Sequence, residues 1–427
     1  MAHIKEYIPI VGQSIIDELY LLAEQLEGKV IQTVNSTAVG GGVAEILNCM
    51  IPLLTEIGVE IYWDLIKGGG CFFNVTKKFH NALHGREEEI TDEMIDVFME
   101  TGTQNIDTMK LNGDILLIHD PQPIMLIKNR HKLPDSKWIW RCHIDVSNPD
   151  RKLWRFLRQF VMEYDACVFS APSFSQRLSD ADTGREVDQF LISPSIDPLS
   201  AKNRDIPRET IDAVLEKYHV GRGKPIVAQI SRYDYLKDPV GVIEAYKLVK
   251  RHIDCQLLLV GNVASDDPEH DRVYSEVREK AEGDPDIHPL VIDPAHNDIE
   301  INALQRAADV IVQKSIKEGF ALTVTEALWK AKPVVASAVG GIPLQITNGF
   351  SGLLTRTVEG TARGIRQVLQ SPEYGRTLGE NGRQHIQNNF LITRHIRDYL
   401  LLFLSTCHEG DVVDFSYHGN SPQQNRR

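Results

Sequence analysis

The sequence has 427 residues, of which 42% are hydrophobic and 25% charged, a composition typical of a globular protein. This length exceeds what one hydrophobic core usually supports and suits two domains of ordinary size. The formal net charge of −13 argues against nucleic acid or an anionic membrane as a partner, because binding either one requires a basic face.

The six cysteines are scattered without a CxxC spacing, which argues against a disulfide framework or a zinc site. Residues 1–20 include Lys5, Glu6, Asp17 and Glu18 and lack the apolar region of a signal peptide. No apolar run reaches the length of a membrane span. We therefore expect a cytoplasmic protein.

The first strand is predicted at residues 29–34, and the glycine-rich loop NSTAVGGGV follows before a helix at 44–57. Gly40, Gly41 and Gly42 would let the backbone approach a ligand or adopt positive φ. A tight turn without a ligand is the alternative. The spacing differs from the GxGxxG pattern, so it does not indicate a nicotinamide site.

Two later strands, at 114–119 and 137–142, end in polar residues, where open parallel sheets bind ligands. Asp120 and Gln122 lie in the proline-stiffened turn after the first of them and are candidate ligands for sugar hydroxyls; alternatively, Asp120 only starts the turn. His143 follows the second strand and is a candidate site residue, although a single histidine is more often a core or surface group.

Both halves of the chain alternate strands and helices, with further strands predicted at 60–65, 167–170, 189–192, 225–230, 255–260, 288–292, 309–312 and 333–336. This pattern predicts an α/β fold of two doubly wound Rossmann-like domains facing each other across a cleft. The proline-dotted segment 194–207 is typical of a linker.

We place an N-terminal domain at 1–198 and a C-terminal domain at 199–390. An apolar helix at 391–410 could pack back across the interdomain region. The polar segment 411–427 is expected to be a poorly ordered tail, because it has few apolar residues to bury.

Arg232 and Lys237 share the short loop after the strand at 225–230. In an acidic protein, two cations at a ligand edge indicate a diphosphate, since arginine can bind oxygens bidentately and lysine supplies a point charge. A solvated surface pair is the alternative.

The stretch 314–341 combines a strand end, the loop KEGFA, a helix at 322–330 and a second strand. Amides at the helix N-terminus suit an anion, and Glu318 and Glu326 suit hydroxyl groups. Together they indicate a ligand with an anionic part and a hydroxyl-rich part, such as a sugar nucleotide. The alternative is that Glu318 caps the helix and Glu326 lies on a solvated face.

Glu318 and Glu326 at this spacing, with Arg232 and Lys237, resemble the signature of the retaining GT-B glycosyltransferases. The resemblance implies that Arg232 and Lys237 hold the donor's diphosphate, Glu318 contacts the donor hexose and Glu326 contacts the nucleoside ribose. It also implies that His143 lies near the transferred sugar. The remaining donor-binding candidates are Gly41, Gly42, Gly319, Phe320, Ala321 and Leu322, and Ala321 stands where many relatives have glycine.

The segments IHDPQP at 118–123 and WRCHID at 140–145 look like those of trehalose glycosyltransferring synthases and the related trehalose phosphorylases. This likeness implies glucose as acceptor, UDP-, ADP- or GDP-glucose as donor, and an α,α-1,1 linkage made with retention. Asp120 and Gln122 would then bind the acceptor. A trehalose phosphorylase using glucose 1-phosphate and a non-catalytic sugar-nucleotide sensor remain alternatives.

No metal or cofactor is expected to be required, although Mg²⁺ could assist as a counterion. The DxD-like run from Asp180 to Asp182 is more typical of a solvated turn than of a metal site. The expected partners are therefore small-molecule substrates, without nucleic acid or membrane. A homodimer and the favoured direction of the reaction are left open.

Overall fold

The computed structural model describes residues 2–39, 41–180, 184–262, 268–292 and 298–407. The chain divides into two compact units. The N-terminal unit comprises residues 3–192 and the chain from Leu391 onward, and the C-terminal unit spans Ser193–Phe390. The last predicted helix thus belongs to the N-terminal unit, while residues 408–427, which include the predicted tail, lie outside the described part.

The N-terminal unit is built on a six-stranded parallel sheet with the order β2-β1-β3-β4-β5-β6. The strands are β1 (Val30–Asn35), β2 (Glu60–Leu65), β3 (Ile115–His119), β4 (Lys137–Arg141), β5 (Ala166–Phe169) and β6 (Asp188–Leu191). Every residue of β3 is buried, as expected for a central strand covered on both faces.

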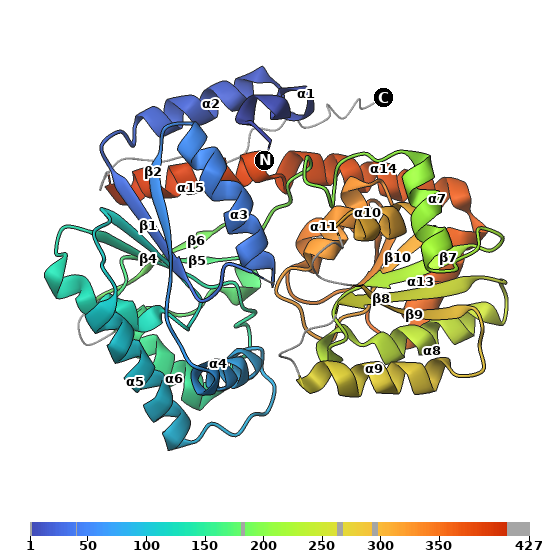
Figure 1. Ribbon diagram of the computed structural model, residues 1–427, viewed down its shortest axis with the longest axis horizontal. Coiled ribbons are helices and arrows are strands. Elements are labelled where there is room, and N and C mark those ends of the chain that lie inside the picture. Colours follow the sequence, from blue (N-terminus) through green and yellow to red (C-terminus); the bar gives the residue numbers. More distant parts are fainter. Residues whose placement is uncertain (1, 40, 181–183, 263–267, 293–297, 408–427) are drawn as a thin grey trace. The chain divides into compact units, whose positions relative to one another are not determined.

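The helices of this unit are α1 (Ile8–Val11), α2 (Gln13–Glu24), α3 (Gly41–Glu56), α4 (Gly70–Leu83), α5 (Asp92–Thr108), α6 (Arg151–Val161) and α15 (Ile392–Cys407), with 3-10 turns at Ile4–Tyr7, Ile124–Lys132 and Pro172–Phe174. Helix α15 packs beside α2 and α3, as Figure 1 shows. Arg397 Nε donates to Glu18 Oε1 at 2.7 Å, so an ion pair reinforces the apolar contact between α15 and α2.

The C-terminal unit repeats this architecture with the strand order β12-β11-β10-β7-β8-β9, also parallel throughout. Its strands are β7 (Ile226–Ile230), β8 (Gln256–Asn262), β9 (Ile287–Ile292), β10 (Val310–Gln313), β11 (Val334–Ser337) and β12 (Leu353–Thr355). The predicted fold class, two doubly wound Rossmann-like α/β domains, is confirmed by the two sheets.

The C-terminal helices are α7 (Arg208–Lys217), α8 (Pro239–Lys250), α9 (Pro268–Ala281), α10 (Asp298–Ala307), α11 (Leu322–Trp329), α12 (Ile342–Gln345), α13 (Val358–Gln370) and α14 (Pro372–Asn389), with a 3-10 turn at Tyr235–Lys237. Helices α8 and α9 lie on one face of the sheet, and α7 and α10 lie on the other, as Figure 1 shows. The core between β7, β8 and α8 includes Val227, Val242, Tyr246 and Leu257, all fully buried.

One local prediction about the chain's course is wrong, and one strand was not predicted. Helix α3 begins at Gly41 rather than at residue 44, so Gly41 and Gly42 form its first turn and not a loop; Gly40 lies outside the described residues. The chain after residue 343 is mostly helical, and it also contains the edge strand β12, which was not predicted. With three residues, β12 is too short to carry a recognisable alternation of apolar and polar side chains.

The proline-dotted segment predicted as a linker is bound to the C-terminal unit. Asn302 Nδ2, on α10, donates to the carbonyl oxygens of Ala201 at 2.9 Å and Arg204 at 2.8 Å. Lys330 Nζ, at the end of α11, donates to Asn203 Oδ1 at 3.0 Å. This part of the chain therefore has a fixed path over α10 and α11, unlike a linker with few contacts.

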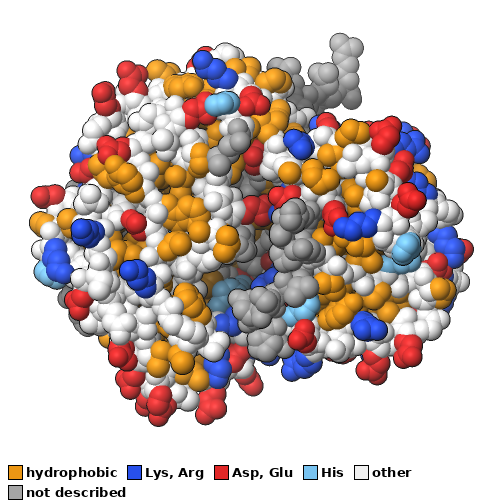
Figure 2. Space-filling model, viewed as in Figure 1, with side chains coloured by type: hydrophobic (Ala, Val, Ile, Leu, Met, Phe, Trp, Pro, Cys, Tyr) orange, Lys and Arg blue, Asp and Glu red, His pale blue; other side chains and the backbone are white. Residues whose placement is uncertain are grey.

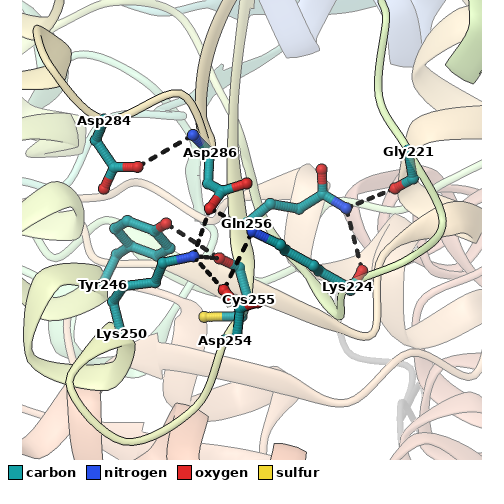
Figure 3. Close-up of polar contacts among 9 residues, drawn as sticks. All are labelled: Gly221, Lys224, Tyr246, Lys250, Asp254, Cys255, Gln256, Asp284 and Asp286. Carbon is teal, nitrogen blue, oxygen red and sulfur yellow. Dashed lines mark hydrogen bonds and ion pairs between the residues drawn. The ribbon is translucent and has the colours of Figure 1, made fainter.

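A network of paired charges joins the amino ends of β7, β8 and β9, as Figure 3 shows. Lys250 Nζ binds Asp286 Oδ2 at 2.5 Å and Asp254 Oδ1 at 2.6 Å, and Lys224 Nζ binds the same two carboxylates at 2.7 and 3.2 Å. Although burial opposes the shift, the hydrogen bonds to Asp254 and Asp286 raise the pKa of Lys250.

Backbone groups complete this network, which we call the amino-edge network: Lys224, Lys250, Asp254 and Asp286. Gln256 Nε2 donates to the carbonyl oxygens of Gly221 at 2.6 Å and Lys224 at 3.1 Å. Hydrogen bonds from Lys224 and Lys250 lower the pKa of Asp286. Each lysine has two carboxylate partners, so the network holds the strand starts together and leaves no unpaired charge among its members.

Two observations describe the surface and the helices of the described residues. Acidic and basic side chains are interspersed over the face shown in Figure 2. None of the described helices is both long enough and apolar enough to cross a membrane.

Candidate active site

Arg232 lies in the loop between β7 and α8, at the carboxyl end of β7. Its Nη2 is 3.5 Å from Asp234 Oδ2, and 51% of its side chain is exposed. Asp234 is buried and accepts a hydrogen bond from the Leu236 amide at 2.7 Å, which fixes the 3-10 turn that follows. Arg232 therefore has one weak ion pair and stays accessible to an anionic ligand.

Lys237, in the same loop, has a different environment. Its Nζ donates to Glu318 Oε2 at 2.5 Å, and only 19% of the lysine side chain and 8% of the glutamate side chain are exposed. Ser315 Oγ donates to the same oxygen at 3.0 Å. The structure thus brings Lys237 and Glu318 together as a buried ion pair, so an anion that binds Lys237 must compete with Glu318 or share the lysine with it.

The loop before α11 carries the predicted anion-binding amides. Ala321 is the N-cap residue of α11 and has φ of 70°, a left-handed conformation that favours glycine. The amides of Phe320, Ala321 and Leu322 donate no hydrogen bond to any residue that the structure describes. They are therefore open donors at the positive end of the helix dipole.

A Gln345 side chain supports this loop from the other side. Its Nε2 donates to the Phe320 carbonyl oxygen at 2.5 Å, and its Oε1 accepts from Thr325 Oγ1 at 2.7 Å. In a trans peptide the C=O and N–H groups point in opposite directions, so this contact directs the Ala321 amide away from Gln345. Gln345 is buried and was not identified from the sequence.

The two glycines after β11 pack against the same loop. Gly340 has φ of 55°, and a Cβ atom there would lie 1.6 Å from the carbonyl oxygen of Glu318. A Cβ at Gly341 would lie 2.8 Å from the carbonyl oxygen of Gly319. Both positions therefore require glycine, since any side chain would displace the backbone that carries Glu318.

Glu326 lies on α11 in a network separate from that of Glu318. It is 4% exposed and accepts a hydrogen bond from Gln305 Nε2 at 2.8 Å, while Lys202 Nζ is 4.0 Å from its Oε1. The alternative that Glu326 lies on a solvated face is therefore wrong. The alternative that Glu318 caps the helix is also wrong, because its carboxylate binds Lys237 and Ser315. Sequence reasoning missed Gln305 and Lys202, for which no motif was visible.

Asp120 lies at the carboxyl end of β3 in the N-terminal unit and has φ of 62°. Its Oδ1 accepts from the His143 amide at 2.7 Å, and its carbonyl oxygen accepts from Trp140 Nε1 at 2.9 Å. Burial raises the pKa of Asp120 to about 6, while the hydrogen bond from the His143 amide and the charge of Arg141 oppose the rise. Asp120 therefore does more than start a turn.

His143 lies two residues after the end of β4 and contacts a histidine that sequence reasoning missed. His119 Nδ1 and His143 Nε2 are 2.9 Å apart, and the rings stack with their centroids 5.2 Å apart. Thr33 Oγ1, on β1, is 2.8 Å from His119 Nε2. The signal was present in the sequence, because His119 ends the strand predicted at 114–119, and His143 directly follows the strand predicted at 137–142.

The electrostatic surroundings keep both imidazoles neutral. Burial, with the charge of Arg141, lowers the pKa of His119 to about 3. Burial, with Arg141, His119 and His395, holds the pKa of His143 well below its usual value. Arg141 is fully buried and bonds Ser170 Oγ and the Ile192 carbonyl oxygen through Nη2, which places a permanent positive charge beneath the pair.

The other N-terminal candidates are less closely grouped. Gln122 Oε1 is buried and has no hydrogen-bond partner among the described residues, so it can accept a hydrogen bond from a ligand hydroxyl. Gly41 and Gly42 lie in the first turn of α3 at the carboxyl end of β1, where they can contribute backbone amides.

The described residues contain no group of three or more His, Cys, Asp and Glu side chains that could hold a metal ion. Asp182 of the DxD-like run lies outside the described part of the chain. Asp180 is in a turn, where its amide donates to the Arg185 carbonyl oxygen at 2.8 Å.

Comparison with known proteins identifies both halves of the chain. Residues 33–176 match the family described as "Trehalose synthase, N-terminal domain", and residues 211–385 match "Glycosyl transferases group 1". Trehalose synthase of Pyrococcus horikoshii is 43% identical over 93% of this chain and 95% of its own length.

More distant matches share part of the sequence or the fold. Trehalose phosphorylase of Pleurotus sajor-caju is 27% identical over 90% of this chain but only 59% of its own length. The crystal structure of an α,α-trehalose-phosphate synthase (UDP-forming) from Burkholderia xenovorans in complex with glucose-6-phosphate superposes with a TM-score of 0.69 at 14% identity. It covers 88% of this chain and 100% of the other, and so shows the shared fold.

The relative at 43% identity shares nearly the whole length of the chain, and the solved structure shares its fold. The chain is therefore a hexosyltransferase with the GT-B fold, and it belongs to the trehalose synthase family.

Proposed function

We propose that the protein makes trehalose from a nucleoside-diphosphate glucose and glucose, with retention of configuration at the transferred carbon. The observation that carries this proposal is the buried Lys237–Glu318 pair beside the open amides that precede α11. A cation and open amides suit a diphosphate, and a carboxylate suits sugar hydroxyls, so one short loop can bind both parts of a sugar nucleotide.

The C-terminal unit would bind the donor. Arg232 and Lys237 would neutralise the diphosphate, and the amides of Phe320 to Leu322 would donate hydrogen bonds to it. Glu318 would accept from hydroxyl groups of the transferred glucose once Lys237 turns toward the phosphate. Glu326, held by Gln305, would accept from the ribose hydroxyls.

The N-terminal unit would bind the acceptor and the edge of the transferred sugar. Gln122 offers an acceptor without a protein partner, and Asp120 offers a carboxylate that already accepts one backbone hydrogen bond. His143 would donate to an oxygen of the transferred glucose.

The proposed retention of configuration must be explained without a carboxylate that attacks the sugar, because neither glutamate is assigned that role. Retaining hydrolases hold two carboxyl groups about 5 Å apart for this purpose. Here Glu318 and Glu326 are engaged in separate networks. We infer a front-face reaction in which the bond from C1 to the diphosphate oxygen breaks, the bond from C1 to the acceptor oxygen forms on the same face, and the acceptor's proton passes to the departing diphosphate.

Product analysis tests the proposal. The purified protein is incubated with glucose and UDP-, ADP- or GDP-glucose, and in a parallel reaction with glucose and glucose 1-phosphate. Trehalose and a nucleoside diphosphate from a nucleotide donor are expected. Trehalose from glucose 1-phosphate alone would make the protein a phosphorylase and reassign Arg232 and Lys237 to inorganic phosphate. Binding of a nucleotide sugar without any disaccharide would indicate a sensor.

A further inference from the structure

Three side chains, from β1, from β3 and from the segment just after β4, form a chain of hydrogen bonds at the N-terminal sheet. Thr33 Oγ1 lies 2.8 Å from His119 Nε2, and His119 Nδ1 lies 2.9 Å from His143 Nε2. Strands β1, β3 and β4 are neighbours in the sheet, which brings these residues into line. Thr33 is fully buried and His119 is 2% exposed, so water does not compete for these contacts.

The burial of Thr33 sets the direction of the hydrogen bonds. His119 Nε2 is the only hydrogen-bond partner of the Thr33 hydroxyl among the described residues. A buried donor without an acceptor is costly, so Thr33 donates its proton to His119 Nε2. A neutral imidazole carries one N–H, and that of His119 must therefore lie on Nδ1 and point to His143 Nε2.

The same rule then applies to His143. Its Nε2 accepts from His119, so the single proton of the neutral ring lies on Nδ1. Nδ1 has no protein acceptor among the described residues, and His143 is partly exposed. The backbone next to the ring is also fixed, because the His143 amide donates to Asp120 Oδ1 at 2.7 Å.

We propose that Thr33 and His119 are positioning residues that hold His143 in its Nδ1-protonated form, so that the ring presents a hydrogen-bond donor to a substrate oxygen. The tautomer follows from the hydrogen-bond chain itself; only the identity of that oxygen, on the transferred glucose, rests on the proposed function. With Nε2 occupied by His119, the ring does not serve as a base through that nitrogen.

Burial and the charge of Arg141 favour the neutral form of both rings, and His395 acts in the same direction on His143. The charged and titratable groups near the chain of hydrogen bonds come from several elements. Arg141 comes from β4, Asp120 from the turn after β3, and His395 and Tyr399 from α15. Protonating His143 would place two N–H groups against each other unless His119 changed tautomer and Thr33 rotated. The chain of hydrogen bonds thus adds a geometric barrier to the electrostatic one.

Long-range ¹H–¹⁵N correlation spectra of protein labelled at histidine test the tautomer directly. The sequence has 15 histidines, so the H143Q variant identifies the signals of His143 by difference. The expected result is a neutral ring with its proton on Nδ1 throughout neutral pH. A proton on Nε2, or a charged ring, would overturn the inference. This result does not depend on which sugars the enzyme uses.

The matched variants are T33V, which removes the hydroxyl at nearly constant volume, and T33S, which keeps it. T33V should leave His143 as a mixture of tautomers and lower kcat/KM about tenfold, the loss of roughly one aligned hydrogen bond, with KM for the acceptor little changed. T33S should keep the single tautomer and at least half of the activity. Unchanged tautomer and activity in T33V would refute the positioning role.

H119Q gives a second measurement if T33V folds poorly, since glutamine can still donate from its amide to His143 Nε2. It should retain the His143 tautomer better than H119F, which has no donor. Equal spectra for the two variants would contradict the inference. If the wild-type protein makes no trehalose from any donor, the proposed function fails while the tautomer measurement still decides this inference.

Discussion

The two edges of the C-terminal sheet use similar charges in opposite ways. At the amino ends of the strands, Lys224 and Lys250 share Asp254 and Asp286 in a network in which each cation has two carboxylate partners. At the carboxyl ends, Lys237 has the single buried partner Glu318, and Arg232 has one partner at 3.5 Å. The first arrangement holds strands together, and the second leaves positive charge that an anionic ligand can bind.

The difference lies in what surrounds each pair. The amino-edge network closes on itself and on backbone carbonyls, such as that of Cys255, which accepts from Lys250 at 2.8 Å. The carboxyl edge has open amides before α11 and a half-exposed arginine. Open donors and an accessible cation at the same edge are what an anionic ligand needs, and the amino-edge network has neither.

Removing Lys237 should have the largest effect. K237M and R232A should each lower kcat for trehalose formation by about a hundredfold or more, because each loses a charge that stabilises the departing diphosphate. K250M at the amino edge is the matched control and should keep kcat within about twofold, because Lys250 is far in the fold from the substrate-binding edge. Unchanged kcat in both carboxyl-edge variants would remove their assignment.

K237M should also lower the free energy of unfolding by about 1–3 kcal/mol, because it leaves the carboxylate of Glu318 buried beside an apolar side chain. K237M/E318L removes both charges and should recover most of that stability without recovering activity. Urea unfolding measures both. If the double variant were no more stable than K237M, the buried charge would not be the cause.

A methyl group at Gly340 should distort the loop at the carboxyl edge of the C-terminal sheet without changing any charge. G340A forces a Cβ to within 1.6 Å of the Glu318 carbonyl oxygen at a positive φ, so the loop must shift. We expect kcat/KM to fall about tenfold or more and stability to fall by about 1–3 kcal/mol. G223A, near the amino edge with nothing within 4 Å of its Cβ, is the control and should have little effect on activity.

Asp120, at the carboxyl edge of the N-terminal sheet, is a partly buried carboxyl group that has, among the described residues, no buried lysine partner of the kind that Glu318 has. Burial, opposed by the His143 amide and Arg141, raises this pKa from 3.8 to about 6. The folded state therefore holds the proton more tightly than the unfolded state, so ionising Asp120 lowers stability as the pH rises from about 4 to about 6. D120N cannot ionise and should be more stable than wild type above about pH 6, by roughly 1–3 kcal/mol, and less active.

Unfolding of wild type and D120N by urea at about pH 4 and about pH 8 measures this difference. At about pH 4 the two proteins should have similar stability. At this pH the carboxyl group of Asp120 is protonated in the folded protein and in part of the unfolded molecules. A D120N variant that is less stable than wild type at both pH values would contradict the account.

Breaking the amino-edge network should cost stability only. In D286N, the neutral amide weakens the contacts of Lys224 and Lys250, which still have Asp254 as a partner. We expect the thermal midpoint to fall by a few degrees, the loss to shrink in high salt, and kcat to stay close to wild type. Loss of activity in a folded D286N protein would contradict the claim that the amino-edge network serves stability and not substrate binding.

The smallest effect is expected at Ala321. Its φ of 70° is strained for alanine, so A321G should raise the free energy of unfolding by up to about 1 kcal/mol or leave it unchanged. Because the α11 amides keep their positions, activity should be similar to wild type. A clear loss of stability in A321G, measured by thermal unfolding, would show that this φ carries little strain.

The sequence predicted best the features that depend on short, local patterns of residues. The apolar β-branched runs located all strands except β12, and their alternation with helices gave the fold class. Arg232, Lys237 and Glu318 were found because polar residues after a buried strand lie at a known edge of the sheet. The Lys237–Glu318 contact joins residues far apart in sequence and became visible only in three dimensions.

The features that the sequence could not supply depend on packing between distant segments. Gln305 reaches Glu326 from another helix, and Gln345 supports the Phe320 carbonyl oxygen from beyond β11. Neither glutamine belongs to a motif. The helical start of α3 at Gly41 also ran against local preference, since glycine is a poor helix former and a run of three usually indicates a loop.

The measurement that tests the central claim most directly is calorimetric titration of UDP, ADP and GDP into wild type, K237M and K250M. We predict that wild type and K250M bind at least one of these nucleotides with similar affinity, and that K237M binds it about tenfold more weakly or worse. Equal affinity in K237M and wild type, or equal losses in K237M and K250M, would contradict the claim that the carboxyl edge of the C-terminal sheet binds the donor's diphosphate.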